Sequence, residues 1–172
     1  MGYFKKDEIS KTQEMLARLA DICLAQLMLS SDAYICMSKH NLHGYKKLHR
    51  HLSKKFQEFY LDVQKESVDK FGYVLDSEVH FKTYNPENLK EHLETWTEIN
   101  EKHLKEVGEI IKSIFEEDGY ICCIAQKIQK ILYENIVKNE KSLQRFCDCN
   151  WSMAVIYSHD DFLHKKLKEE DK

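Results

Sequence analysis

Four of the nine histidines lie within twelve residues of the chain: His40, His43, His49 and His51. Imidazole is a common ligand for iron, zinc, copper and nickel, so this cluster is a candidate metal site. The alternative interpretation is a solvated surface of Lys, His and Arg side chains, in which histidines near a helix end are favoured by the helix dipole when protonated.

Two carboxylates, Asp62 and Glu66, are four residues apart. On a helix this spacing places them on one face, where they could chelate a divalent cation with a ligand from a neighbouring subunit. The alternative is ion pairing with Lys65 or Lys70. We take His49, Asp62 and Glu66, with His40 as an accessory, as the predicted metal ligands.

The remaining chemistry-bearing residues give weaker signals. Cys147 and Cys149 with His159 and His164 are zinc-compatible, but one residue between the cysteines is a tighter gap than the usual two to four. All six cysteines are expected to be reduced, because the amino terminus carries no secretory signal, and we expect a cytoplasmic protein. The sequence has no Gly-rich phosphate loop and no Walker pattern.

Composition limits the partners. The net charge is −3 and the pI about 6.3, so no broad electrostatic attraction to nucleic acid or membrane is expected. We identify no apolar run near the roughly 20 residues that a membrane span requires. A DNA partner has only the terminal lysines in its favour: Lys5, Lys6, Lys165, Lys166 and Lys168.

The elements that must position these residues are long helices. One Pro and five Gly in 172 residues leave few turns. Apolar residues recur at three and four positions, which predicts five helices in one domain, over about residues 7–38, 45–71, 87–117, 120–146 and 151–168. Gly44 and Gly72 are expected to supply left-handed helix ends. Residues 72 to 86 are expected to form an extended connection.

The connection lengths predict the topology. A short turn can join only antiparallel neighbours, so the first two helices form one hairpin and the next two another. The link between the hairpins is long enough to cross the whole bundle. This all-α arrangement, a four-helix bundle with one long crossover and a short fifth helix, is the ferritin-like one.

The order of elements resembles the ferritin-like superfamily, and two segments resemble its Dps mini-ferritins. The run from Lys39 to Gly44, followed by Leu48-His49, is similar to the His-Trp-Asn-Val-x-Gly and Leu-His-Glu motif at the end of the family's first helix. Asp62, Glu66 and the Phe71-Gly72 pair resemble the Asp-x-x-x-Glu and terminal Gly of its second helix. The resemblance implies a homo-oligomeric shell that handles iron.

The larger ferritins and bacterioferritins hold a di-iron centre with glutamates and Glu-x-x-His motifs. This sequence has no Glu-x-x-His, and the corresponding positions fall near Leu27, Gln57 or Phe59, Tyr60 or Asp62, Asn100, Tyr133 and Ile136. An intrasubunit ferroxidase centre of the usual kind is therefore expected to be missing. The second helix has no Met at the haem-ligand position of bacterioferritins, and we expect no haem.

Two functions follow from these observations. The leading one is an iron-storage or iron-detoxification protein that oxidises Fe(II) and sequesters it in an oligomeric shell, with a degenerate or intersubunit ferroxidase site. The alternative is a non-catalytic, divergent four-helix bundle that serves assembly or protein–protein interaction. The His cluster and the Asp62/Glu66 pair favour the first, and the missing Glu-x-x-His favours the second.

Overall fold

The computed structural model describes residues 6–77 and 82–170, which form five helices. They are α1 (Lys6–Lys39), α2 (His43–Phe71), α3 (Leu89–Ile114), α4 (Gly119–Asp148) and α5 (Met153–Glu170). No strand occurs in these two ranges. The predicted all-α class and the five helices are therefore confirmed, with helix ends that differ by a few residues.

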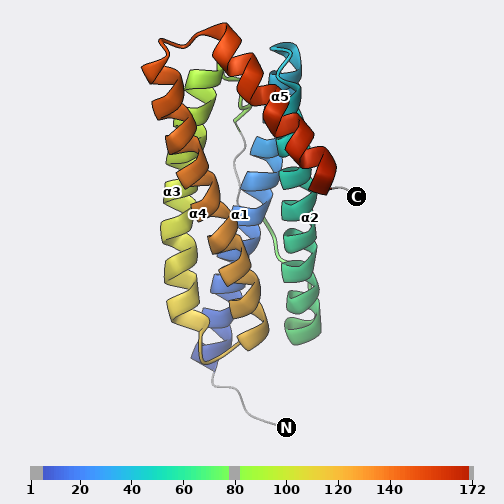
Figure 1. Ribbon diagram of the computed structural model, residues 1–172. Coiled ribbons are helices and arrows are strands. Elements are labelled where there is room, and N and C mark those ends of the chain that lie inside the picture. Colours follow the sequence, from blue (N-terminus) through green and yellow to red (C-terminus); the bar gives the residue numbers. More distant parts are fainter. Residues whose placement is uncertain (1–5, 78–81, 171–172) are drawn as a thin grey trace.

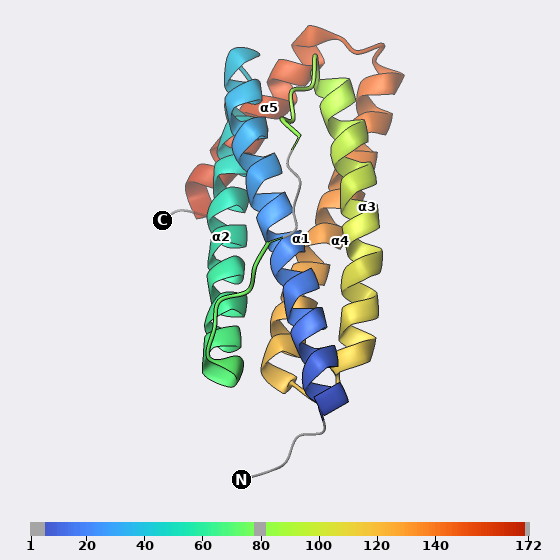
Figure 2. The same cartoon turned by 180° about the vertical axis from the view of Figure 1, so that it is seen from behind.

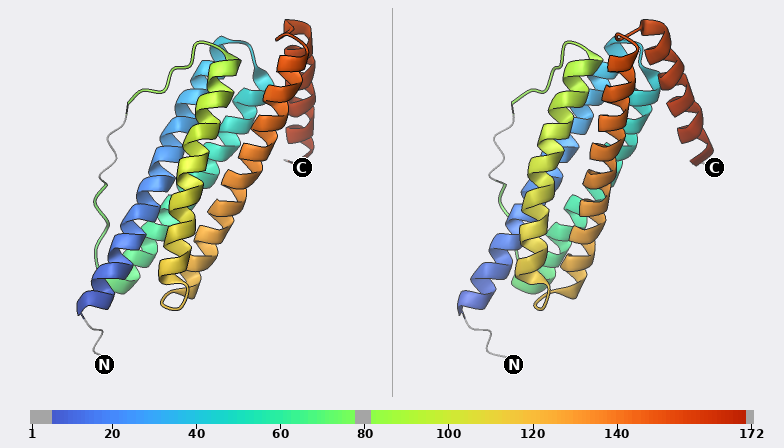
Figure 3. Two further views of the ribbon diagram at one scale, coloured as in Figure 1. Left: turned by 90° about the vertical axis from the view of Figure 1, so that its left-hand side faces the viewer. Right: turned by 60° about the vertical axis from the view of Figure 1, so that its left-hand side comes forward.

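Helices α1 and α2 form one antiparallel hairpin, and α3 and α4 form the other (Figure 1). The two hairpins pack into a four-helix bundle. α5 leaves the end of the bundle and slopes back along the outside of α2 (Figure 3). The core is lined by large apolar side chains that are fully buried: Leu16, Leu19, Met37, Phe56, Leu93, Trp96, Ile110, Ile121, Ile128, Leu132 and Phe146.

The long connection between the hairpins follows α1, as the views from behind show (Figure 2). Ser77 Oγ donates to Asp21 Oδ1 at 3.2 Å, the Tyr84 N–H donates to Asp32 Oδ2 at 2.9 Å, and Cys36 Sγ donates to the Pro86 carbonyl at 3.1 Å. The α1 residues of these contacts span 15 positions, about 22 Å of helix. The predicted crossover is thus held by side chains of α1 and not by strand pairing.

The turn between α1 and α2 corrects the expectation for Gly44. The left-handed residue is Asn41, with φ 58°, and the N–H of Leu42 bonds to the Met37 carbonyl at 2.9 Å, as in a Schellman helix end. Gly44 lies inside α2, where a Cβ atom would come within 2.1 Å of the Asp160 carbonyl oxygen. Glycine is needed there for the close approach of α5, not for a turn. Gly72, with φ 80°, does end α2 as predicted.

Part of α1 corrects the expectation that no segment is long and apolar enough to cross a membrane. The stretch Lys11–Lys39 meets that test by length and composition, and half of its most apolar window is buried in the bundle. A core helix of a four-helix bundle passes the same test, because it is apolar for packing.

Candidate functional site

A buried polar cluster occupies the middle of the bundle, between α1 and α3. We call Gln26, Asn100 and His103 the mid-bundle cluster. Gln26 Nε2 donates to Asn100 Oδ1 at 2.9 Å and to His103 Nδ1 at 2.8 Å, and the three residues are at most 9% exposed. Asn100 and His103 are three residues apart on α3 and therefore share one helix face.

The charge state of the mid-bundle cluster follows from its hydrogen bonds. Both protons of the Gln26 amide are used, so His103 Nδ1 accepts and its remaining proton is on Nε2. Burial lowers the pKa of His103 to about 4, assisted by the charge of Lys102. The cluster is therefore neutral at pH 7.

A second buried group lies between α2 and α3. His49 Nε2 and His92 Nε2 are 2.8 Å apart, and Tyr84 Oη lies 2.6 Å from His92 Nδ1. Both imidazoles are fully buried, and the ring of Trp96 stacks on that of His92 at 5.3 Å between centroids. Burial lowers the pKa of His92 to about 3 and that of His49 well below its usual range. Both histidines are neutral, and one Nε2 donates to the other.

The His49–His92 pair is closed to a shared metal ion in this arrangement. Two imidazole nitrogens that bind one tetrahedral ion at 2.0–2.1 Å lie about 3.3 Å apart. The observed 2.8 Å is a direct hydrogen bond between the nitrogens. His49, a predicted metal ligand, is therefore a buried core residue, and no part of its side chain reaches the surface.

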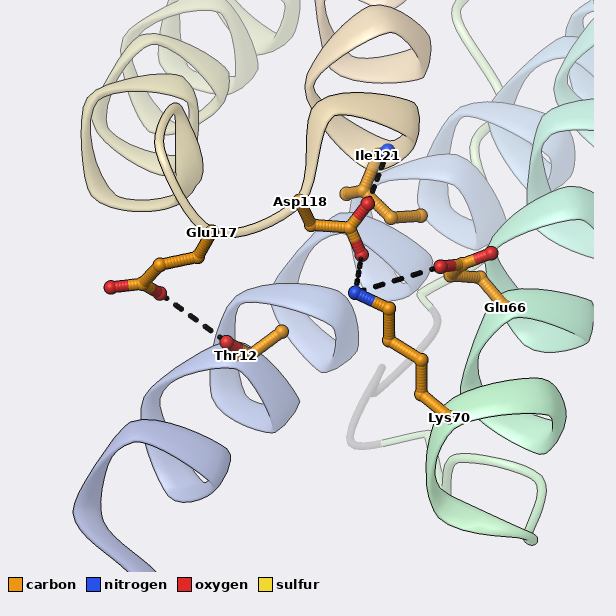
Figure 4. Close-up of polar contacts among 6 residues, drawn as sticks. All are labelled: Thr12, Glu66, Lys70, Glu117, Asp118 and Ile121. Atoms are coloured by element: carbon orange, nitrogen blue, oxygen red, sulfur yellow. Dashed lines mark hydrogen bonds and ion pairs between the residues drawn. The ribbon is translucent and has the colours of Figure 1, made fainter. Parts of the chain in front are cut away.

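Glu66, another predicted ligand, takes part in an ion-pair network where α2 meets the start of α4 (Figure 4). Lys70 Nζ lies 2.5 Å from Asp118 Oδ2 and 3.7 Å from Glu66 Oε1. Asp118 Oδ1 also accepts the Ile121 N–H and so caps α4. Burial and the charge of Asp118 raise the pKa of Glu66, while Lys70 lowers it. The alternative of pairing with Lys70 is the arrangement observed.

The structure does not bring the four predicted ligands together. Asp62 is half-buried one turn before Glu66, but it follows His49 by thirteen residues, about 20 Å along α2. His40 comes directly after α1, at the opposite end of the hairpin, and lines two small surface pockets. Among the described residues, no three His, Cys, Asp or Glu side chains are grouped to hold a metal ion. An intersubunit site with Asp62 and Glu66 stays a prediction about the assembly.

The same holds for the cysteines within the described ranges. Cys147 and Cys149 are exposed free thiols that form no such group with His159 and His164. Burial lowers the pKa of His159, which packs against Phe146 at 5.4 Å between ring centroids. The contact between Phe146 and His159 therefore packs α5 against the end of α4.

The sequence comparison placed Asn100 near a position that holds an iron ligand in the larger ferritins. The sequence analysis did not single out Gln26, His92 or His103 as members of buried polar groups. A signal was present, because Gln26 lies three residues after Cys23 and four before Ser30, on the buried face of α1. Polar residues within an apolar stripe mark a buried network.

The mid-bundle cluster does not fit a di-iron centre. Such a centre requires carboxylates to balance the charge of the ions, and a buried site without them would hold uncompensated charge. Here the donors are two amides and one neutral imidazole, already bonded to each other. The arrangement can fix the register of α1 against α3, and it offers no carboxylate or other anionic ligand.

Comparison with known proteins supports the architecture. No family model matches the chain, and no curated protein matches it in sequence. Among solved structures, it is similar to an open-pore ferritin from the hyperthermophilic archaeon Archaeoglobus fulgidus, with a TM-score of 0.69 and 13% sequence identity. The match covers 95% of this chain and 98% of the archaeal one. Together with the two hairpins, the crossover along α1 and the short α5, this match shows that the chain has a ferritin-like fold.

Proposed function

We propose that this chain is a ferritin-type subunit that assembles with copies of itself and has no ferroxidase centre of its own. The observation that carries the proposal is the mid-bundle cluster. Gln26 Nε2 donates to Asn100 Oδ1 and to His103 Nδ1 at 2.8–2.9 Å, and none of the three side chains is an anionic group that could balance the charge of bound iron.

Assembly is supported by apolar side chains that the single chain leaves exposed. Leu61 and Val68 are 57% and 43% exposed and are seven residues apart on one face of α2. We call them the α2 stripe. Phe162 of α5 is 65% exposed. Exposed apolar surface is typical of protein–protein interfaces, and a two-fold interface between identical chains buries the same patch on each copy.

Iron sequestration is the second candidate, because the structural neighbour is a ferritin over nearly its whole length. For this function, Fe(II) as substrate would be captured by carboxylates brought together between subunits. Asp62 and Glu66 are one turn apart on α2, and a second subunit packed against this helix could add ligands. His40 is the accessory residue of this candidate.

Two measurements on the purified protein test the two candidate functions: its mass in solution and its rate of Fe(II) oxidation. The mass of the purified protein in solution, measured by light scattering, is expected to exceed the 20.5 kDa of one chain. The rate of aerobic Fe(II) oxidation is expected to equal that of buffer, because no ferroxidase ligands are assembled. A monomer at micromolar concentration would overturn the assembly proposal.

Oxidation clearly above the buffer rate would favour the second candidate, and Asp62→Asn would then locate the site. This substitution removes a charge without disturbing the Lys70 network, whereas Glu66→Ala would also remove an ion pair. Asp161→Asn is the matched control, since Asp161 is an exposed carboxylate of α5. Loss of oxidation in the first variant only would place iron chemistry at Asp62.

A further inference from the structure

A surface pocket of about 680 Å³ lies between α2, α1 and α5, away from the mid-bundle cluster. We call it the basic pocket. Most of its lining comes from three turns of α2, and the residues are His43, Lys46, Lys47, Arg50, His51 and Lys54. Tyr34 of α1 and His164 of α5 complete it. Two histidines of the sequence cluster, His43 and His51, are thus part of this pocket.

The charge of the basic pocket is of one sign. Four of its side chains, three lysines and one arginine, are cationic at pH 7, and no acidic side chain is among its described lining residues. The chain as a whole carries a net charge of −3. Like charges gathered in a hollow repel one another and strengthen the local field, so a bound anion would relieve this repulsion.

The pocket is built by a specific contact between helices. Asp160 of α5 accepts the backbone N–H groups of Gly44 and Tyr45 at 3.1 and 2.9 Å, and the absence of a Cβ at Gly44 permits this approach. Asp160 is buried, and both of its oxygens are used in this contact. His164 lies one turn further along α5 and is therefore held over α2. Its Nδ1 is buried and has no hydrogen-bond partner among the described groups.

One cation is held in place by an aromatic ring. Lys46 Nζ lies 5.3 Å from the centroid of the Tyr34 ring, within the range of a cation–π contact. The ammonium is thus oriented at the wall of the pocket before any ligand arrives. Lys47 and His51 each have an interaction of their own, and the other cations of the pocket, Lys46, Arg50 and Lys54, follow one another at intervals of four residues on α2.

We propose that the basic pocket binds a compact polyphosphate anion, such as inorganic triphosphate or the phosphate chain of a nucleotide. Arginine and lysine are the usual phosphate ligands, and arginine can bind two phosphate oxygens at once. The cations from Lys46 to Lys54 extend over about 12 Å of α2, which is more than a single phosphate can contact. The volume is that of a small-molecule site.

The test is calorimetric titration of the full-length protein with inorganic triphosphate. Arg50→Ala/Lys54→Ala removes two cations from exposed positions of the pocket, and we expect about a tenfold or greater loss of affinity. Lys127→Ala/Lys138→Ala is the control, because it removes two exposed cations from α4, which contributes no lining residue. Its affinity is expected to stay within about twofold of the parent. Unchanged far-ultraviolet circular dichroism verifies the fold of both variants.

Titrations with ATP and with duplex DNA distinguish which kind of phosphate-containing molecule the pocket binds. Equal affinities for ATP and triphosphate indicate recognition of the phosphate chain alone, and tighter binding of ATP indicates a nucleotide; either result supports the proposal. No binding of triphosphate by the parent, or an equal loss in both variants, overturns it. Duplex DNA that binds more tightly and is not displaced by triphosphate also overturns it, and assigns this surface to nucleic acid instead.

Discussion

At the residue scale, the buried histidines are structural groups held neutral by the core. His92 and His103 each have a hydrogen-bonded nitrogen and a pKa lowered by burial, to about 3 and about 4. One hydrogen bond joins the Nε2 atoms of His49 and His92. These residues hold α3 against α1 and α2, a role that charged imidazoles could not fill in the same surroundings.

The lowered pKa values predict acid sensitivity. The pKa of His103 is about 6.5 in the unfolded chain and about 4 in the folded one, so between these values the unfolded chain binds more protons and the free energy of unfolding falls as the pH falls. Protonation of this histidine alone is expected to make the free energy of unfolding about 2 kcal/mol lower at pH 5 than at pH 7. Urea unfolding at both pH values would measure it.

His103→Gln isolates this contribution. The variant keeps a polar side chain for Gln26 but cannot be protonated, so the stability difference between pH 7 and pH 5 should shrink by about 2 kcal/mol. His43→Gln is the control, because its side chain is exposed to solvent. An unchanged difference in the His103 variant would contradict the neutral, buried state.

At the element scale, the position of α5 depends on one glycine of α2. The Asp160 carboxylate takes the place of a side-chain cap at the start of α2, where Leu42 offers none. Since the Asp160 carbonyl occupies the space of a Cβ at Gly44, the close approach of the two helices requires glycine at this position. The basic pocket, which includes residues of both helices, exists because of this contact.

Gly44→Ala should therefore detach or displace α5. We expect a loss of about 1–3 kcal/mol, because the clash is with backbone and cannot be relieved by a rotamer change. Gly108→Ala in α3 is the matched control, since a Cβ there meets nothing within 4 Å and should stabilise the helix by about 0.5–1 kcal/mol. Thermal melting measures both effects. Faster hydrogen exchange confined to α5 and the start of α2 is the expected signature; an equally stable Gly44 variant would contradict this account.

At the scale of the whole molecule, exposed apolar side chains and a cluster of cations lie on the exterior of the bundle, while the interior holds the packed core. Among the described residues of α2, the two exposed large apolar side chains are those of the α2 stripe. The mid-bundle cluster and the His49–His92 pair lie on the inside. The proposed assembly therefore depends on the exterior of the bundle.

Leu61→Glu/Val68→Glu is expected to shift the mass in solution toward that of one chain, because two carboxylates per copy would be buried in the interface. The helical content should not change, since both side chains are largely exposed. Phe115→Glu is the control: Phe115 is 65% exposed, but it lies at the turn after α3. Light scattering gives the mass. An oligomer that survives the double substitution would exclude the α2 stripe as its interface.

The sequence by itself determined the elements and their order. Apolar periodicity is a local property, so it located the five helices, and the lengths of the connections allowed only two hairpins with one crossover. The missing Glu-x-x-His could be read directly from the chain. Pairing of Glu66 with Lys70 was already one of two alternatives, because residues four apart on a helix are neighbours.

The tertiary structure alone decided which side of each helix faces a neighbour. His49 looked like a ligand beside Leu48, but it lies four residues after Tyr45 and three before Leu52, on the buried face, where it meets His92. Gln26 and Asn100 meet across 74 positions of sequence, and Gly44 meets Asp160 across 116. Contacts between residues that are distant in the sequence depend on how the helices pack. The apolar periodicity of a single helix cannot specify that packing. These contacts make the mid-bundle cluster and the His49–His92 pair buried, neutral groups, and they place the cations of α2 on the surface.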